Sequence, residues 1–140
     1  MAANESTSEF WRLFWRSEIS AVASLLICAT IIALYGFFDG LRTAGTQPKP
    51  LLSPMEAAKF AFLYSITIGL LPVILYGAPL YAAAKFFQFL SWKLVITIGL
   101  LPGLVIYFFG EHELGLWFIA LGVGVSILTH LFSEKARRLG

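Results

Sequence analysis

The charged residues of this sequence leave four long stretches without any charge, and this spacing constrains the fold more than any other feature. The uncharged stretches are residues 19–38, 60–84, 94–110 and 114–133, which are 20, 25, 17 and 20 residues long. About 20 apolar residues in a helix span the roughly 30 Å hydrocarbon core of a bilayer. Because that core offers no partners for backbone polar groups, each stretch is predicted to be a transmembrane α-helix.

The composition supports a membrane protein rather than a soluble one. Of the 140 residues, 59% are hydrophobic and 13% are charged. A soluble enzyme, a nucleic-acid-binding protein or a disordered chain could not keep so much apolar surface away from water. We therefore expect an all-α, polytopic membrane protein, in which residues 1–140 form a single domain with transmembrane helices at 19–38, 57–83, 93–110 and 115–133.

The lysine and arginine residues predict the orientation of the chain, because cytoplasmic segments carry an excess of them. Four spans place both termini on one side of the membrane. The basic residues on that side are Arg12, Arg16, Lys85, Lys93, Lys135, Arg137 and Arg138, whereas the opposite side has Arg42, Lys49 and Lys59. This excess predicts a multi-pass protein of a bacterial-type inner membrane, with the N and C termini in the cytoplasm.

Residues 6–18 are predicted to form an amphipathic helix that lies at the membrane interface. Ser6-Thr7-Ser8-Glu9 has the spacing of a capping box, which starts a helix. In a helix from this start, the charged side chains share one narrow arc and aromatic residues cover much of the remainder. Arginines beside aromatic rings are typical of the headgroup region, although a docking site for a partner is the alternative. The expected interface anchors are Trp11, Arg12, Trp15 and Arg16.

Residues 39–53 are predicted to be an exposed loop, because glycine and proline interrupt a stretch with few apolar residues. The loop ends at Ser53-Pro54-Met55-Glu56. Serine as the cap, proline at the first helical position and glutamate at the third indicate the start of a helix. The second span is therefore expected to begin outside its uncharged stretch.

The sequence Ile-Thr-Ile-Gly-Leu-Leu-Pro occurs twice, at 66–72 and at 96–102. In the predicted topology the two copies cross the bilayer in opposite directions, each with a glycine and a proline near the middle of its span. Proline removes a helical hydrogen bond and clashes with the carbonyl four residues earlier, so two kinked helices are expected. The threonine of each copy is a candidate donor to the freed carbonyl. The positions singled out for helix kinking or interaction are Thr67, Gly69, Pro72, Thr97, Gly99 and Pro102.

Two interpretations of this repeat are open. Matched helix breaks in antiparallel segments can mark a transporter site at the middle of the bilayer. Alternatively, the two helices are kinked and pack through Gly69 and Gly99. The packing interpretation is favoured, because the flanking sequence does not repeat and the uncharged stretches lack the ionisable groups that substrate sites usually contain.

Small residues recur at intervals of four in the first and last stretches. Such spacing lets two helices approach closely in lipid, where packing and hydrogen bonds hold helices together. The residues concerned are Ser20, Ser24 and Cys28 in the first stretch, and Ala120 with Gly124 and Gly122 with Ser126 in the last. We interpret the series in the first stretch, which includes the single cysteine, as a packing seam within the chain.

No arrangement of residues in the sequence indicates catalysis, a metal or a cofactor. Glu111-His112-Glu113 is the best candidate for metal ligands, but adjacent residues point in different directions and tetrahedral sites draw on separated positions. The uncharged stretches contain neither a pair of carboxylates nor a histidine at the depth of a serine that it could activate. We therefore expect neither an enzyme nor a nucleic-acid-binding protein.

Four short spans with cytoplasmic ends and no catalytic groups give a layout that resembles two kinds of small membrane protein. One protects bacteria against pore-forming toxins, and the other is an accessory subunit of a membrane complex. The layout thus implies an immunity or accessory protein, which binds another membrane-embedded protein, or a second copy, by helix contacts within the lipid bilayer. The alternative is a small transporter or channel for a neutral or lipid-like substrate, built on the proline-containing spans two and three.

Overall fold

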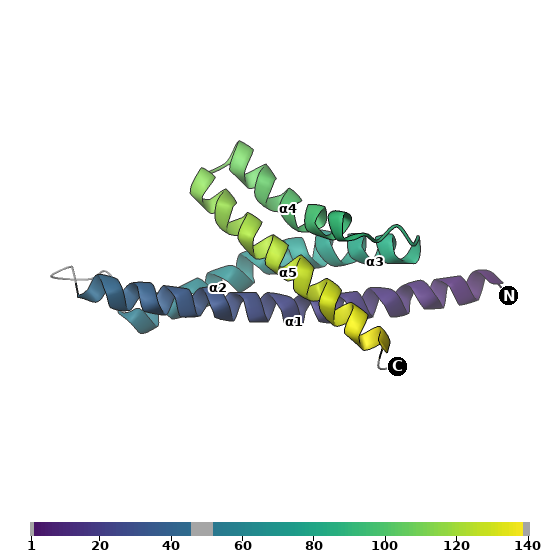
Figure 1. Cartoon of the computed structure of the whole chain (residues 1–140), viewed down its shortest axis with the longest axis horizontal. Coiled ribbons are helices and arrows are strands. Elements are labelled where there is room, and N and C mark those ends of the chain that lie inside the picture. Colours follow the sequence, from purple (N-terminus) through teal and green to yellow (C-terminus); the bar gives the residue numbers. More distant parts are fainter. Residues whose placement is uncertain (1, 46–51, 139–140) are drawn as a thin grey trace.

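The computed structural model describes residues 2–45 and 52–138, and every regular element in this part of the chain is helical. Its α-helices are α1 (Ala2–Ala44), α2 (Pro54–Pro72), α3 (Ala78–Phe86), α4 (Trp92–Phe109) and α5 (His112–Arg138). A π-helical segment, η1 (Val73–Gly77), joins α2 to α3 in one continuous rod (Figure 1). The prediction of an all-α chain is confirmed.

α2 begins at the signal predicted from the sequence. The Ser53 side chain accepts a hydrogen bond from the Glu56 backbone N–H (Oγ···N 3.3 Å), and the Glu56 carboxylate accepts one from the Ser53 N–H (Oε2···N 2.9 Å). Two N–H groups that the start of a helix would otherwise leave without partners are thereby satisfied. α4 begins in a related way, because Ser91 Oγ accepts a hydrogen bond from the Leu94 N–H at 3.3 Å.

α1 is one uninterrupted helix that contains both the predicted interfacial segment and the predicted first span. It begins at Ala2, so the predicted helix start at Ser6 is wrong. It also continues to Ala44, which corrects the prediction that a loop begins at residue 39. Residues 46–51 of the predicted loop lie outside the described residues.

α1 continues past its apolar stretch because of hydrogen bonds within its last turns and contact with the start of α2. The Thr43 hydroxyl donates to the carbonyls of Asp39 and Gly40, at 3.0 and 3.1 Å. Gly40 lies so close to α2 that a Cβ added to it would be 2.9 Å from Pro54 Cα. Packing of α1 against α2 thus extends the helix where local sequence favours a loop.

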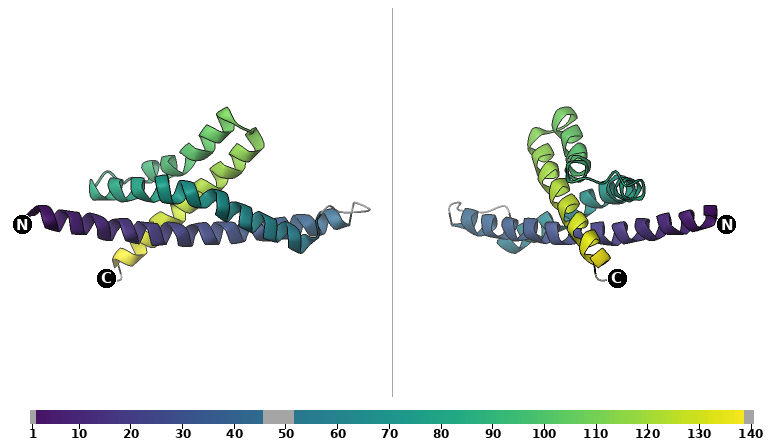
Figure 2. Two further views of the ribbon diagram at one scale, coloured as in Figure 1. Left: turned by 180° about the vertical axis from the view of Figure 1, so that it is seen from behind. Right: turned by 45° about the vertical axis from the view of Figure 1, so that its right-hand side comes forward.

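The helices form two hairpins. In the first, α1 runs beside the rod of α2, η1 and α3, and in the second, α4 runs beside α5 (Figures 1 and 2). The hairpins meet mainly where α5 crosses α1, whereas α2 and α4 make little direct contact. The N-terminal end of α1 and the C-terminal end of α5 lie towards the same end of the molecule (Figure 2).

The core lies at the crossing of α1 and α5. Its buried members are Leu25, Cys28, Leu121 and Val125. Small residues allow this close approach, because a Cβ added to Gly124 would lie 3.2 Å from Cys28 Sγ. The hydroxyls of Ser24 and Thr129 are hydrogen-bonded across the same crossing at 3.3 Å. The series of small residues in the first span is therefore a seam within the chain, as predicted.

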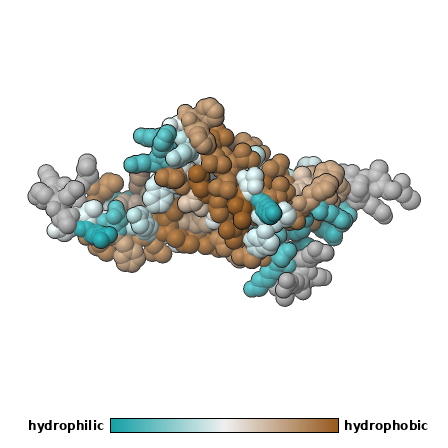
Figure 3. Space-filling model, turned by 45° about the horizontal axis from the view of Figure 1, so that its top comes forward, coloured by the Kyte–Doolittle hydropathy of each residue, from teal (hydrophilic) through white to brown (hydrophobic). Residues whose placement is uncertain are grey.

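The outer surface of the molecule is strongly apolar. Phe109 is 90% exposed and Leu75 is 72% exposed, and Figure 3 shows apolar residues over most of the centre of one face. The helices that are long and apolar enough to cross a membrane lie at Ser8–Ala44, Pro54–Phe86, Trp92–Phe109 and His112–Lys135. An apolar surface of this extent needs lipid or protein to cover it, which indicates a multi-pass membrane protein. The choice of membrane and the cytoplasmic position of the termini stay predictions.

Candidate functional site

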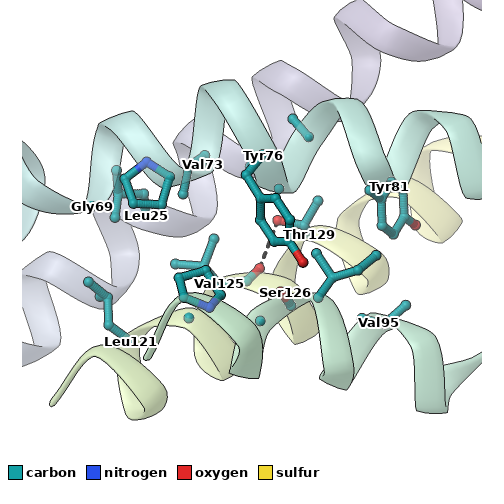
Figure 4. A pocket seen from close by; sticks show the side chains of 18 of the residues that line it. Leu25, Gly69, Val73, Tyr76, Tyr81, Val95, Leu121, Val125, Ser126 and Thr129 are labelled. Atoms are coloured by element: carbon teal, nitrogen blue, oxygen red, sulfur yellow. Dashed lines mark hydrogen bonds between the residues drawn. The ribbon is translucent and has the colours of Figure 1, made fainter. Parts of the chain in front are cut away.

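Four of the six residues singled out in the two repeat copies line one small cavity between the hairpins. Gly69 and Pro72 reach it from α2, and Gly99 and Pro102 reach it from α4. The cavity has a volume of about 60 Å³, and side chains of α1, η1, α3 and α5 complete its wall (Figure 4). Because α2 and α4 run in opposite directions (Figure 1), the two copies supply the same residue types to the cavity from antiparallel helices.

The first copy of the repeat leads into the π-helical segment η1. Pro72 has no N–H, so it cannot donate the regular helical hydrogen bond. The Val73 N–H is shared between the carbonyls of Gly69 and Leu70, and the Ala78 N–H donates to the carbonyl of Val73, five residues earlier. This spacing of five is the hydrogen bond of a π turn, which accommodates one extra residue in the helix.

The second copy stays α-helical, because α4 continues through Pro102 to Phe109. The sequence predicted a kinked helix at each copy. In the structure, only the first copy leads into an irregular segment. The residues that follow each copy differ. Gly77 and Pro79 follow the first copy, and the corresponding positions after the second copy hold Tyr107 and Phe109. Pro79 removes a second donor from the same rod, so η1 lies between two prolines.

The two repeat glycines pack against different kinds of atom. A Cβ added to Gly99 would lie 2.5 Å from the Gly122 carbonyl oxygen and 2.7 Å from Ser126 Oγ, both in α5. A Cβ added to Gly69 would lie 2.7 Å from Cδ1 of Leu25, the end of a side chain in α1. The glycines thus pack on α5 and α1, and not on each other's helices as the packing interpretation supposed. Gly99 fixes the spacing of the second hairpin, whereas the neighbour of Gly69 can move.

The repeat threonines do not line the cavity. Thr67 and Thr97 are exposed. The Thr97 hydroxyl donates to the Lys93 carbonyl at 2.8 Å. Its expected bond to the carbonyl of Ile98 is therefore wrong, because a helical threonine reaches the carbonyl four residues before it and not the one that follows.

A groove on the outer surface lies beside the cavity, between the two prolines. This groove has a volume of about 360 Å³ and is lined by Pro72, Tyr76, Leu101, Pro102 and Val105. Its wall shares both prolines and Tyr76 with the cavity. Figure 4 shows the Tyr76 ring extending from η1 towards the α4–α5 hairpin. The cavity wall is mostly apolar, so a few methylene groups of a hydrocarbon chain suit it better than a hydrated ion.

A polar cleft of about 960 Å³ lies next to the cavity, and Tyr81 lines both spaces. The Tyr81 hydroxyl is hydrogen-bonded to Nδ1 of the buried His130 at 3.0 Å. The Trp92 ring meets the His130 imidazole edge-on, with centroids 4.4 Å apart. The Lys85 ammonium donates to Ser133 Oγ. These contacts join α3, α4 and α5 around the cleft.

The four predicted interface anchors divide into two pairs. Trp11 and Trp15 are 52% and 61% exposed. Arg12 and Arg16 instead line the polar cleft. α1 thus presents aromatic rings to its surroundings and guanidinium groups to the cleft, and the position of this segment at a membrane interface stays a prediction.

Glu18 is a buried acidic residue that the sequence analysis did not identify. Its side chain is 8% exposed, and its Oε1 atom has no hydrogen-bond partner in the described part of the chain. In the sequence, Glu18 is the last charged residue before the first uncharged stretch. It therefore indicates where the span begins and gives no sign of burial. The neighbouring Ser17 hydroxyl lies 3.4 Å from the Ala78 carbonyl, so this turn of α1 packs against α3. The burial of Glu18 thus occurs in a turn of α1 with a tertiary contact, which the sequence pattern does not contain.

No protein-family model matches the chain, and no curated protein or solved structure is significantly similar to it. Within residues 2–45 and 52–138, no three His, Cys, Asp or Glu side chains gather in a group that could hold a metal ion. The predicted metal-ligand candidate His112 stacks on the Tyr107 ring, with centroids 4.8 Å apart. The function is therefore inferred from the cavity and the cleft themselves.

Proposed function

We propose that the protein is a small membrane transporter for a lipid-like substrate, part of whose hydrocarbon chain binds in the cavity between the hairpins. The observation that carries this proposal is that the glycine and proline of both repeat copies line the same cavity. Related segments that approach one site from antiparallel helices are typical of transporter substrate sites. This favours the transporter alternative over packing alone.

The lining of the cavity supports an apolar group of the substrate. Its volume of about 60 Å³ is small, and the groove between Pro72 and Pro102 is the proposed entry from the surrounding lipid. The little direct contact between α2 and α4 leaves the two hairpins able to separate at this entry. π-helical turns such as η1 also occur frequently at functional sites.

The polarity of the cavity argues against an ion as the substrate. Among the described residues that line it, none is charged, and the polar side chains are Tyr76, Tyr81, Ser126 and Thr129. An ion in such a site would lose its hydration without compensation, which costs far more than burying a hydrocarbon chain. A neutral or amphiphilic substrate is the better match.

An immunity or accessory role is the second candidate. Its support from small-residue seams is reduced, because Gly124 packs on Cys28 and Gly122 packs on Gly99 inside the chain. The outward apolar face of α1, where Ile31 is 59% exposed and Phe38 is 64% exposed, still offers a surface to a partner helix. In this case a strain without the gene should become sensitive to a membrane-depolarising toxin of its neighbours, and unchanged viability would exclude the immunity role.

Lipid transfer by purified protein in liposomes tests the transporter directly. The wild-type protein should accelerate movement of a phospholipid with a labelled acyl chain between the two leaflets. Val73→Phe should lower this rate about tenfold, because the larger ring occupies the cavity that Val73 lines. The matched control is Ile74→Phe, since Ile74 is 39% exposed and should leave the rate unchanged. If folded wild-type protein moves no lipid, the transporter proposal fails.

A further inference from the structure

We infer that the substrate is an anionic phospholipid, and that its phosphate binds in the polar cleft among Arg12, Arg16 and Lys85. This inference rests on the proposed function and adds the chemical class of the substrate. All three basic residues line the cleft, and they come from α1 and α3.

The cavity and the cleft together have the form of a site for an amphiphile. Tyr81 lines both spaces, so they are adjacent. Along α4, Trp92 lines the cleft and Val95, three residues later, lines the cavity. Along α5, Thr129 lines the cavity and His130 lines the cleft. An amphiphile bound at this end of the bundle would therefore have the cleft around its polar headgroup and the apolar cavity beside the first part of its chain.

The charges that line the cleft favour an anion. Besides Arg12, Arg16 and Lys85, the cleft contains the carboxylates of Glu9 and Glu134. Glu134 Oε1 lies 3.8 Å from His130 Nε2. The basic side chains thus exceed the acidic ones by one before any charge on His130 is counted. This surplus complements a singly charged phosphodiester, whereas a zwitterionic headgroup would bring its own cation to a site that is already positive.

The positions of the basic groups suit a phosphate at the membrane surface. Arg12 and Arg16 lie one helical turn apart, so their side chains share a face of α1. Guanidinium groups present planar arrays of N–H donors that match phosphate oxygens. Lys85, on α3, is held at the cleft by its bond to Ser133 Oγ. In the predicted topology this end of the bundle faces the cytoplasm, where the leaflet is rich in anionic lipids.

A competition between two lipids tests the inference. Purified protein in detergent is incubated with equal amounts of phosphatidylglycerol and phosphatidylcholine that have identical acyl chains, and bound lipids are counted by native mass spectrometry. The wild-type protein should retain phosphatidylglycerol in about tenfold excess. The double variant Arg12→Gln, Arg16→Gln should bind both lipids equally, because it keeps the cavity and loses the surplus of positive charge. Its thermal unfolding should be unchanged, since both side chains are exposed.

The control removes the same charge from the same end of the molecule. Lys93 and Lys135 are exposed and do not line the cleft. The double variant Lys93→Gln, Lys135→Gln should keep the tenfold preference. If both double variants lose the preference equally, general attraction to the basic surface explains it, and the assignment of the cleft is overturned.

Two further outcomes separate this inference from the proposed function. If the protein transfers lipid in liposomes but shows no preference for phosphatidylglycerol, the inference fails and the transporter proposal stands. If it retains phosphatidylglycerol selectively but transfers nothing, the headgroup site stands and the transporter proposal fails. Free glycerol phosphate at the same concentration should not displace the lipid, because it has no chain for the cavity. Displacement would assign the cleft to a soluble phosphate ester and overturn the assignment to a lipid.

Discussion

The two copies of Ile-Thr-Ile-Gly-Leu-Leu-Pro are identical in sequence and differ in structure. The first copy passes into the π-helical segment Val73–Gly77, whereas the second continues as a regular α-helix to Phe109. The difference follows from the next residues, because Pro79 removes a second backbone donor from the first rod and Phe109 at the corresponding position removes none. The seven-residue motif thus does not determine by itself whether the helix after it is α-helical or π-helical. The residues in the next two turns determine this.

The copies also differ in what surrounds them. In the α4–α5 hairpin, Gly99 meets the backbone of Gly122, which cannot withdraw without moving a helix. In the rod of α2, η1 and α3, Gly69 meets the end of the Leu25 side chain, which can change its rotamer. The second copy is therefore part of a rigid hairpin, and the first copy is the adjustable wall of the cavity.

The largest expected difference between the copies is in stability. Gly99→Ala should lower the free energy of unfolding in detergent by about 3 kcal/mol, because the new methyl group forces α4 away from α5. Gly69→Ala should cost less than about 1 kcal/mol, because Leu25 can move aside. Unfolding curves of the two variants measured side by side check this. Equal losses would mean that Leu25 cannot move aside. They would contradict the proposed difference between a rigid second copy and an adjustable first copy.

The second effect concerns the π-helical segment. Pro79→Ala restores a backbone N–H donor. The π turn of η1 can then be replaced by regular α-helix, in which each N–H donates to the carbonyl four residues earlier instead of five. α3 would then turn by about 100°, which carries Tyr81 away from His130. The lipid transfer rate should fall about tenfold while the protein stays folded. Phe109→Ala, at the corresponding position after the second copy, is the control and should leave the rate unchanged. A Pro79→Ala variant that transfers lipid normally would show that η1 has no role in transfer.

The smallest effect is expected at the second proline. Because α4 is already helical through Pro102, the change Pro102→Ala should add one hydrogen bond and raise the free energy of unfolding by about 1 kcal/mol or less. The transfer rate should stay within about twofold of wild type. A severe loss of transfer would mean that both prolines act alike, and would restore the symmetry that the sequence suggests.

The sequence predicts the helices better than their ends. Each transmembrane helix depends on its own apolar composition, and the start of α2 depends on the local pair Ser53 and Glu56, so both were accessible without the structure. The end of α1 was not, because Asp39 and Gly40 favour a loop by themselves. Their helical conformation is accompanied by contact with the start of α2, a tertiary contact that the pattern of residues 39–53 does not contain.

The site could be predicted only in part. The repeat identified Gly69, Pro72, Gly99 and Pro102 as special, but not the cavity that they share, because helix pairing is a tertiary property. The same lack of tertiary information hid the burial of Glu18, which lies in the turn of α1 where Ser17 contacts α3. Directionality within a helix explains the wrong assignment of Thr97, whose hydroxyl bonds backwards along the chain.

The crossing of α5 over α1 determines when the cavity can exist during biosynthesis. The hairpin of α1 with α2, η1 and α3 is synthesised first and can enter the membrane with one side of the cavity already formed. The residues that close the other side include Leu121, Gly122 and Val125, which belong to the last helix to emerge. A nascent chain that has not yet inserted α5 thus has no enclosed cavity, because one wall of it is still missing.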